Sequence, residues 1–393
     1  MPKVSVIIPT YNQATFLREA VDSVLQQSFG DFEVIIVDDG SSDETPDVAQ
    51  SINDHRVIYH RQENRGLAGA RNSGVALSTG EYLAFLDSDD LLLPKKIATQ
   101  VTALEDQPAI GLVASGWEYI TENGLPLGMG KPWVGRAAPD LESILIGGLT
   151  VVHAVLLRRT WFERVGGFDP SFRMAEDMDF WYRLGLAGCP MMWVPAIVCQ
   201  YRIHGANMSR AVIWHFDALR RALDRLFAHP DLPVTLRGRR NSIFAEVRLA
   251  EAGRLYGIGD VEEAKGALRK ALILDPMLCS ETNDKLADLI GSWPQDVWAG
   301  NSTDMLDRVF ANLPSEPALP LRLRRRIELT SAKAGFYQAF STNNAVQIRR
   351  LWMKVALSEP SWLLNRGGWA ILLKSFKQLP SRRATRVIEP YDI

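Results

Sequence analysis

Residues 82–90, YLAFLDSDD, join a short apolar run to three carboxylates and decide the predicted fold. The apolar part has the composition of a buried β-strand. Asp87 and Asp89 lie two positions apart on the segment that leaves it, so both can reach one hard cation and its waters. Taken alone, the same pattern is also typical of a turn or a helix cap.

Three similar apolar runs precede this one, at residues 4–9, 32–37 and 57–60. Residues 14–27 carry apolar side chains at helical spacing, and further helices are predicted from about residue 45 and around residues 68–76. Strands that alternate with helices form a parallel sheet with helices on both faces. The sequence therefore predicts a doubly wound α/β sheet whose ligand binds outside the carboxyl ends of the strands.

Polar residues follow each predicted strand. They are Thr10-Tyr11-Asn12, Asp38-Asp39, residues 61–65 and Asp87-Ser88-Asp89-Asp90. Because the carboxyl ends of parallel strands meet at one edge of a sheet, we expect these clusters to line one crevice.

The composition, with 47% hydrophobic and 23% charged residues over 393, is that of a globular chain of two or three domains. A net charge of −2 hides an acidic start, since residues 1–110 hold 8 Lys/Arg against 17 Asp/Glu. That balance disfavours a nucleic-acid partner and suits a divalent cation. The basic remainder could face anionic lipid or phosphate, or could simply be solvated charge.

The start of the chain has neither a signal-peptide pattern nor an apolar run of ~20 residues, so a cytoplasmic location is expected, with peripheral contact at the inner face of the membrane left open. Three cysteines without a CxxC pair argue against a disulfide framework or a structural zinc site.

From about Trp214 the chain is predicted to be all-helical, with helices near residues 220–227, 243–256, 261–274, 322–340 and 346–357. A weak repeat places Asn343-Asn344 through Glu359-Pro360 over Gly259-Asp260 through Asp275-Pro276, at an offset of 84 residues. The first copy resembles the second helix of a tetratricopeptide unit. A plain helical bundle shows the same spacing and remains the alternative.

Four motifs in residues 2–93, namely VSVIIPTYNQ, FEVIIVDDGSSDET, ENRGLAGARNSG and GEYLAFLDSDDLLLP, resemble the donor-binding half of glycosyltransferase family 2. VGGFD with MAEDMDFW, at residues 165–181, resembles its acceptor-side motif. The resemblance implies a GT-A-type nucleotide-diphospho-sugar transferase that usually inverts the anomeric carbon. It assigns residues 1–213 to a catalytic domain, with a donor half (1–95) and an acceptor half (96–213), and leaves residues 214–393 as a helical domain.

The resemblance also implies roles for individual residues. A divalent ion, Mn²⁺ or Mg²⁺, is expected at Asp89, with Asp87 holding the ribose or a metal-bound water and His204 approaching the metal or the diphosphate. Asp38 is either a partner in the site or a strand-end cap. The remaining nucleotide-sugar contacts are expected at Pro9, Thr10, Tyr11, Asp39, Arg71, Ser88 and Arg202.

Inversion needs a base on the acceptor side, and Asp177 in the pair Glu176-Asp177 is the candidate. A carboxylate in the first turn of a helix is the alternative for each of these acids, and the stronger interpretation for Asp179. His153 is expected in the core or lining the acceptor cleft.

The sequence thus predicts an inverting, metal-dependent transfer of sugar, with a UDP-sugar favoured, to a hydroxyl in polysaccharide, glycolipid or glycoprotein synthesis. A sugar-phosphate nucleotidyltransferase and an inactive scaffold acting through its helices are the alternatives. We expect the helical domain to govern self-association, partner choice or membrane attachment. Residues 361–376, SWLLNRGGWAILLKSF, are the candidate interfacial segment, unless they only close the bundle.

Overall fold

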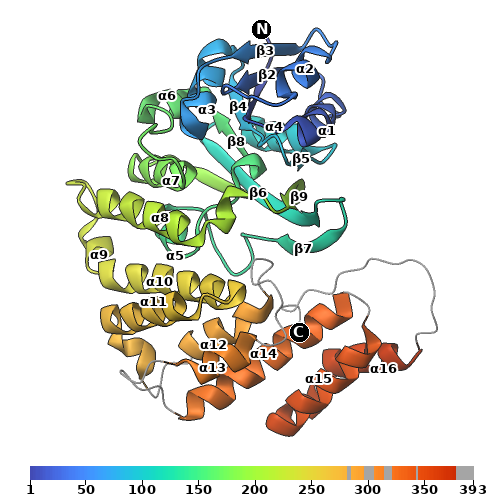
Figure 1. Cartoon of the computed structure of the whole chain (residues 1–393), viewed down its shortest axis with the longest axis vertical. Coiled ribbons are helices and arrows are strands. Elements are labelled where there is room, and N and C mark those ends of the chain that lie inside the picture. The colour runs from blue at the N-terminus through green and yellow to red at the C-terminus, as the bar shows by residue number, and fades with distance from the viewer. Residues whose placement is uncertain (281–284, 296–304, 314–320, 342–343, 378–393) are drawn as a thin grey trace. The chain divides into compact units, whose positions relative to one another are not determined.

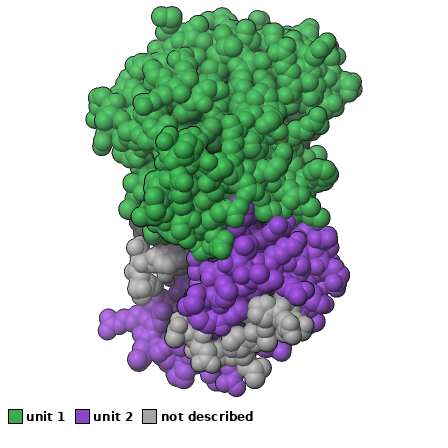
Figure 2. All heavy atoms as spheres, turned by 90° about the vertical axis from the view of Figure 1, so that its left-hand side faces the viewer, with its two compact units in different colours: residues 1–243 green, residues 244–393 purple. Residues whose placement is uncertain are grey.

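The computed structural model describes residues 1–280, 285–295, 305–313, 321–341 and 344–377 (Figure 1). The chain divides into two compact units, residues 1–243 and 244–393 (Figure 2). None of the helices within the described ranges is long and apolar enough to cross a membrane.

The first unit begins with the predicted alternation of strands and helices. Four parallel strands lie in the order β3-β2-β1-β4, so the chain starts in the middle of the sheet and winds outward in both directions. β1 and β2 are buried along their whole length, which explains their near-continuous apolar sequence. The elements are β1 (Val4–Thr10), α1 (Ala14–Leu25), β2 (Phe32–Asp38), α2 (Thr45–Gln50), β3 (Val57–Arg61), α3 (Gly66–Leu77) and β4 (Tyr82–Phe85).

Beyond β4 the sheet becomes mixed. β8 pairs antiparallel with β4 and β6, β9 runs parallel to β6, and β5 pairs antiparallel with β9, while β7 forms a hairpin with β6. The predicted mixed α/β class is therefore confirmed. This part contains β5 (Leu91–Leu92), α4 (Lys96–Asp106), β6 (Leu112–Thr121), β7 (Pro126–Gly130), α5 (Leu141–Gly147), η1 (Val152–Ala154), β8 (Val155–Arg158), α6 (Arg159–Val165), α7 (Glu176–Leu186), β9 (Met191–Ile203) and η2 (Met208–Arg210).

The short strand β5 fixes the position of residues 87–90, the carboxylate loop that follows β4. Leu91 pairs with Gln200 and Leu92 with Cys199, so this loop is held against the end of β9. Leu92 and Cys199 are buried in the main core of the sheet, so this pairing is anchored by apolar packing. Residues 87–90 and 201–204 consequently meet although more than a hundred positions separate them.

The C-terminal part is helical, as predicted. α8 and α9 belong to the first unit, and α10 spans the division, so the two compact units divide later in the chain than residue 213. The end of the catalytic domain at residue 213 stays a prediction. The elements are α8 (Val212–Phe227), α9 (Val234–Arg237), α10 (Arg240–Ile258), α11 (Val261–Leu274), η3 (Pro276–Cys279), α12 (Lys285–Ser292), η4 (Trp293–Gln295), α13 (Met305–Ala311), α14 (Leu321–Ser341), α15 (Ala345–Ser358), η6 (Pro360–Leu364) and α16 (Arg366–Lys377).

The weak repeat has a structural counterpart. α11 and α15 are both 14 residues long, and each is followed by a 3₁₀ turn that starts at a proline, Pro276 or Pro360. The starts of the two helices and of the two turns all match at the predicted offset. Asn343, at the start of the second copy, lies outside the described residues. A tetratricopeptide-like solenoid stays a prediction.

Candidate active site

The loop after β1 is tied to the loop after β2. Asn12 has a positive φ of 53°, a conformation that asparagine tolerates better than most residues. Its backbone N–H donates to Ser41 Oγ (2.9 Å), and its Oδ1 accepts from the backbone N–H of Ser42 (2.8 Å). Pro9 and Thr10 are buried beside it, whereas Tyr11 is 50% exposed. An exposed aromatic ring at a strand end is available to stack on a ligand.

The two aspartates after β2 are occupied by the protein itself. Asp38 is fully buried and accepts hydrogen bonds from Ser41 N–H (2.8 Å) and Tyr59 Oη (2.8 Å), which are the contacts of a strand-end cap. Asp39 accepts from the backbone N–H groups of Arg65 and Gly66, both at 2.8 Å, and thus holds the start of α3. The Asp39 carboxylate therefore ties the end of β2 to the start of α3, at the point where the sequence predicts a nucleotide contact.

Arg71 links the loop after β4 to the start of α7. Its guanidinium is buried and donates through Nη2 to Asp87 Oδ1 (2.6 Å) and through Nη1 to Glu176 Oε1 (2.5 Å). α3 thus carries one cation between the loop after β4 and the start of α7. A buried arginine shared by two carboxylates fixes both of them, because removing it would leave their charge uncompensated.

The carboxylate loop meets the end of β9 at His204. Nε2 of His204 lies 2.9 Å from Asp89 Oδ2, and Nδ1 accepts a hydrogen bond from Ala206 N–H (3.3 Å). Nε2 can donate its proton to Asp89 or, in the other tautomer, offer its lone pair to an ion held at Asp89. The structure brings together the two residues that the sequence placed at the metal, with His204 only 6% exposed and Asp89 half-buried.

Arg202 also holds the carboxylate loop in place through hydrogen bonds. Its buried guanidinium donates from Nε to the carbonyl of Asp89 (2.9 Å), from Nη1 to the carbonyl of Glu122 (2.6 Å) and from Nη2 to Glu19 Oε2 (2.7 Å). All three nitrogens are engaged within the protein. Where the sequence predicts a phosphate contact, the structure shows a residue that positions the loop.

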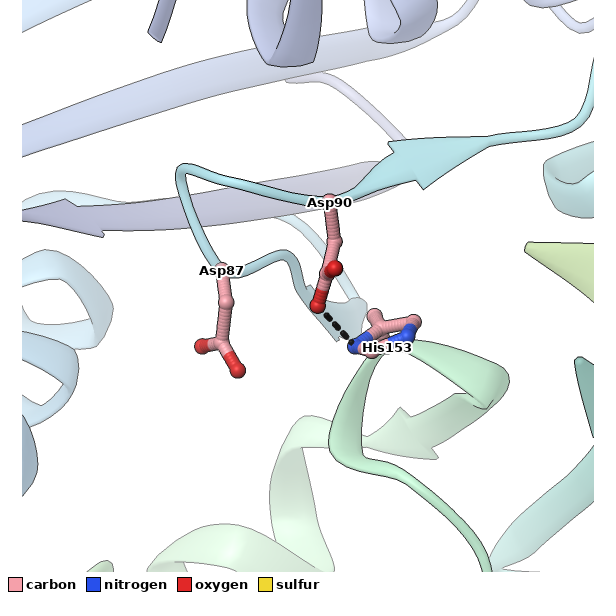
Figure 3. Close-up of side chains that lie close together, drawn as sticks. All are labelled: Asp87, Asp90 and His153. Atoms are coloured by element: carbon pink, nitrogen blue, oxygen red, sulfur yellow. Dashed lines mark ion pairs between the residues drawn. The ribbon is translucent and has the colours of Figure 1, made fainter. Parts of the chain in front are cut away.

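A buried pair, Asp90 and His153, lies beneath the loop (Figure 3). Asp90 comes from the loop after β4 and His153 from η1, and Asp90 Oδ2 is 3.3 Å from His153 Nδ1. Oδ1 of Asp90 accepts from the backbone N–H of Arg202 (2.6 Å). Burial raises the pKa of Asp90, helped by the charge of Asp89, and lowers the pKa of His153 to about 4. Near neutral pH the imidazole is therefore uncharged.

Sequence reasoning placed Asp90 in the polar cluster after the strand and His153 in the core or the acceptor cleft, but it did not pair the two residues. Asp90 was visible in the motif, whereas His153 is a lone histidine among apolar residues, and only the fold brings it to the loop. Single ligand atoms of Asp87, Asp90 and His153 lie within 4.8 Å of one another, which is close enough to hold one ion. The predicted position of His153 in the core is consistent with its complete burial.

Three acids, Glu176, Asp177 and Asp179, follow a turn with an unusual backbone conformation. Ala175 has a positive φ of 56°, strained for alanine, and α7 starts at the next residue. Glu176 is buried against Arg71, and Asp179 is buried and accepts from Arg183 Nε (2.7 Å). Asp177 is half-buried, and its only hydrogen bond to a described residue is accepted by Oδ1 from Met178 N–H.

Burial raises the pKa of both Glu176 and Asp177, while Arg71 opposes the rise. Glu176 and Asp179 are buried and each accepts a hydrogen bond from an arginine. Asp177 is partly exposed, and no arginine of the described residues lies within hydrogen-bonding distance of it. It is the acid on this turn that can accept a proton from a bound molecule.

Comparison with known proteins agrees with this geometry. The sequence model of Glycosyl transferase family 2 matches residues 5–166. A protein of Rickettsia typhi described as an uncharacterized glycosyltransferase is 33% identical over 217 residues, which cover 54% of this chain and 67% of that protein. The chain belongs to glycosyltransferase family 2. The predicted family and enzyme class are confirmed, and the nucleotidyltransferase alternative is set aside.

Two solved structures share the fold of this family 2 transferase. S. aureus TarS in complex with UDP-GlcNAc has a TM-score of 0.53 at 18% identity and covers 83% of this chain and 90% of that one. The mannosyltransferase PcManGT from Pyrobaculum calidifontis, in complex with GDP-Man and Mn²⁺, has a TM-score of 0.52 at 21% identity, with coverages of 80% and 88%. These similarities confirm the predicted GT-A-type fold.

Proposed function

We propose that the chain inverts the anomeric carbon while it moves a sugar from a nucleoside diphosphate donor to an acceptor hydroxyl, with Asp177 as general base. The observation that carries the proposal is Arg71. Its two ion pairs join the carboxylate loop of Asp87 and Asp89 to the turn of Glu176 and Asp177, so donor-side and acceptor-side acids occupy one site.

The oxygen and nitrogen ligands that these side chains offer fit a divalent cation. Carboxylate oxygens suit Mn²⁺ and Mg²⁺, and the imidazole of His204 favours Mn²⁺ of the two. We assign Asp89 and His204 as the residues that would hold the ion, with Asp87 nearby, because they are less deeply buried than Asp90 and His153. A bound cation offsets the charge that grows on the diphosphate as it leaves. PcManGT was solved with Mn²⁺, which supports this choice.

The protein groups account for the remaining steps. Asp177 takes the proton of the acceptor hydroxyl as the oxygen attacks the anomeric carbon; the new glycosidic bond forms as the bond to the diphosphate breaks, and inversion follows from attack opposite the leaving group. Arg71 holds Glu176 in place, which keeps the neighbouring Asp177 oriented. Arg202 acts as a positioning residue, because it fixes the carbonyl of Asp89 and thereby the carboxylate loop.

We favour a UDP-sugar as donor, because TarS was solved with UDP-GlcNAc; PcManGT, solved with GDP-Man, keeps GDP-sugars as the alternative. The acceptor is proposed to be a carbohydrate or glycolipid hydroxyl in polysaccharide, glycolipid or glycoprotein synthesis. Catalysis is assigned to residues 1–213, and the helices beyond them to self-association, partner choice or membrane contact.

Calorimetry with UDP and Mn²⁺ tests the proposal. The native protein should bind UDP only weakly without metal, and Asp89→Ala should lose the metal-dependent part, while Asp22→Ala on the solvent face of α1 should retain it. Undiminished binding by the Asp89 variant would remove its metal role. Screening donor hydrolysis with UDP, GDP and dTDP sugars then identifies the donor, and absence of binding to any of these nucleotides would refute the transferase site as drawn.

A further inference from the structure

α15 presents an exposed apolar stripe. Val346, Met353 and Leu357 follow one another at helical spacing and are 71%, 58% and 79% exposed. Arg350 lies within the same stripe, and the buried Ile348 and Val355 lie on the other side of the helix. An amphipathic surface helix normally turns its apolar face inward and its polar face to water. α15 instead carries large apolar side chains on both faces.

The neighbouring segment repeats the pattern. Trp362 is buried in the bundle core, which fits the expectation that residues 361–376 close the bundle. The same segment nevertheless exposes large apolar side chains on η6 and α16, so closing the bundle does not account for all of it. These are Leu363 (47%), Leu364 (84%), Trp369 (37%), Leu373 (54%) and Phe376 (63%).

The two exposed stripes lie on neighbouring helices. The partly exposed Arg349 guanidinium lies 5.0 Å from the centre of the exposed Phe376 ring, so α15 and α16 are in contact beside their stripes. Trp352 and Trp369 also pack against each other, with ring centres 4.6 Å apart. We call the exposed side chains of α15, η6 and α16 the outer helical surface.

The outer helical surface is strongly basic. Arg349, Arg350, Lys354, Arg366 and Lys374 come from these elements, and none of them forms an ion pair with a carboxylate among the described residues. Glu359, the acid between α15 and η6, is itself paired with Lys333 at 2.5 Å. The apolar side chains are therefore accompanied by positive charge that no carboxylate of the described residues pairs with.

We propose that the outer helical surface binds an anionic phospholipid membrane. Its leucines and aromatic rings insert at the boundary between headgroups and acyl chains, and its arginines and lysines contact lipid phosphates. A second copy of the chain fits less well, because a symmetric contact would place two basic surfaces against each other. The proposal concerns attachment and is independent of the transferase chemistry.

Co-sedimentation of the full chain with phosphatidylcholine vesicles, with and without phosphatidylglycerol, tests the proposal. The native protein should bind the anionic vesicles and lose binding in high salt. The double variant Leu357→Asp/Leu373→Asp changes two exposed side chains and should bind at least tenfold more weakly, since each inserted leucine contributes roughly tenfold. The double variant Arg350→Glu/Lys354→Glu should weaken binding to anionic vesicles and reduce its salt dependence.

Matched controls lie on α11 of the same unit. Ile273→Asp alters an apolar side chain that is 62% exposed, and Arg269→Glu/Lys270→Glu makes the same change of charge on exposed residues. Both should bind like the native chain, and all variants should show native circular dichroism and donor hydrolysis. Failure of the native chain to bind anionic vesicles at low salt, or equal losses in the α11 controls, would overturn the proposal. So would concentration-dependent self-association that only the Leu357/Leu373 variant loses, since the occupant would then be a second copy.

Discussion

Lys96 offers a quantitative test of the packing behind the site. It lies in the first turn of α4, is 1% exposed, and donates from Nζ to the carbonyl of Val155 (3.0 Å), the residue that follows η1. A lysine without a buried carboxylate partner is expected to lose its proton easily. Burial lowers the pKa of Lys96 from 10.5 to about 7. We predict that Lys96→Met stabilises the protein at pH 7 and destabilises it at pH 10.

The magnitude follows from linkage. Between the folded pKa of about 7 and the unfolded value of 10.5, the unfolded chain binds the proton that the folded chain lacks, so native stability rises with pH by about 1.4 kcal/mol per unit. At pH 7 the mismatch destabilises the native protein by about 4 kcal/mol, and at pH 10 by about 1 kcal/mol. Methionine removes this term but also removes the buried hydrogen bond to the Val155 carbonyl, which costs about 1–3 kcal/mol.

Urea unfolding of the native chain, Lys96→Met and the exposed-neighbour control Lys95→Met at pH 7 and pH 10 measures the effect. The Lys96 variant should gain roughly 1–3 kcal/mol at pH 7 and lose the gain by pH 10, whereas the Lys95 control should differ little from the native chain at either pH. A variant less stable than the native chain at pH 7, or a difference independent of pH, would show that the Lys96 pKa is not lowered in the fold.

Four further outcomes are expected. Asp177→Asn should lower the transfer rate roughly 10²–10⁴-fold with little change in nucleotide affinity. Asp179→Asn breaks a buried ion pair with Arg183 and should mainly lower the denaturation midpoint. Comparable rate losses in the two variants would show that Asp177 is not the base. Arg71→Leu should destabilise by about 3–5 kcal/mol, and adding Glu176→Gln should restore part of it in urea unfolding; additive losses would mean that the ion pair is not what holds the turn. Arg202→Lys should weaken Mn²⁺ affinity roughly 10–100-fold in titrations followed by UDP binding, and an unchanged affinity would deny its positioning role. Chelation with EDTA should abolish transfer reversibly, with Mn²⁺ restoring it; full activity in the chelator would exclude a required metal.

The parallel part of the sheet, β1 to β4, could be predicted from the sequence because its signals are local. The apolar runs of β1 and β2 specify strands buried on both faces, and the helical spacing between them specifies α1. Crossover connections between neighbouring strands are short and right-handed, so this alternation of strands and helices favours a parallel sheet. The polar residues that follow these strands then meet at one edge, which is why Asp87 and Asp89 could be placed at that edge without coordinates.

The helices of the C-terminal region could also be predicted, since α11 and α15 follow from the periodicity of their own residues. The exposure of their individual side chains could not be predicted in this way. Within residues 361–376, Trp362 packs into the bundle whereas Leu364 remains at the surface, and both are apolar residues of one short segment. A periodic pattern identifies a helix and its faces, but which face finds a partner depends on the helices packed around it.

The tertiary structure alone decided how the acids of the site differ. Glu176 and Asp177 are adjacent carboxylates with the same local signal, yet Arg71, more than a hundred residues away, pairs with the first and leaves the second half-buried. In the same way β5 and β9 bring Arg202 and His204 to the carboxylate loop, and η1 brings His153 beneath it. Charge state and accessibility depend on burial and on partners within a few ångströms. Those partners come from distant segments, so the local sequence determines which groups are present and the fold determines what each of them can do.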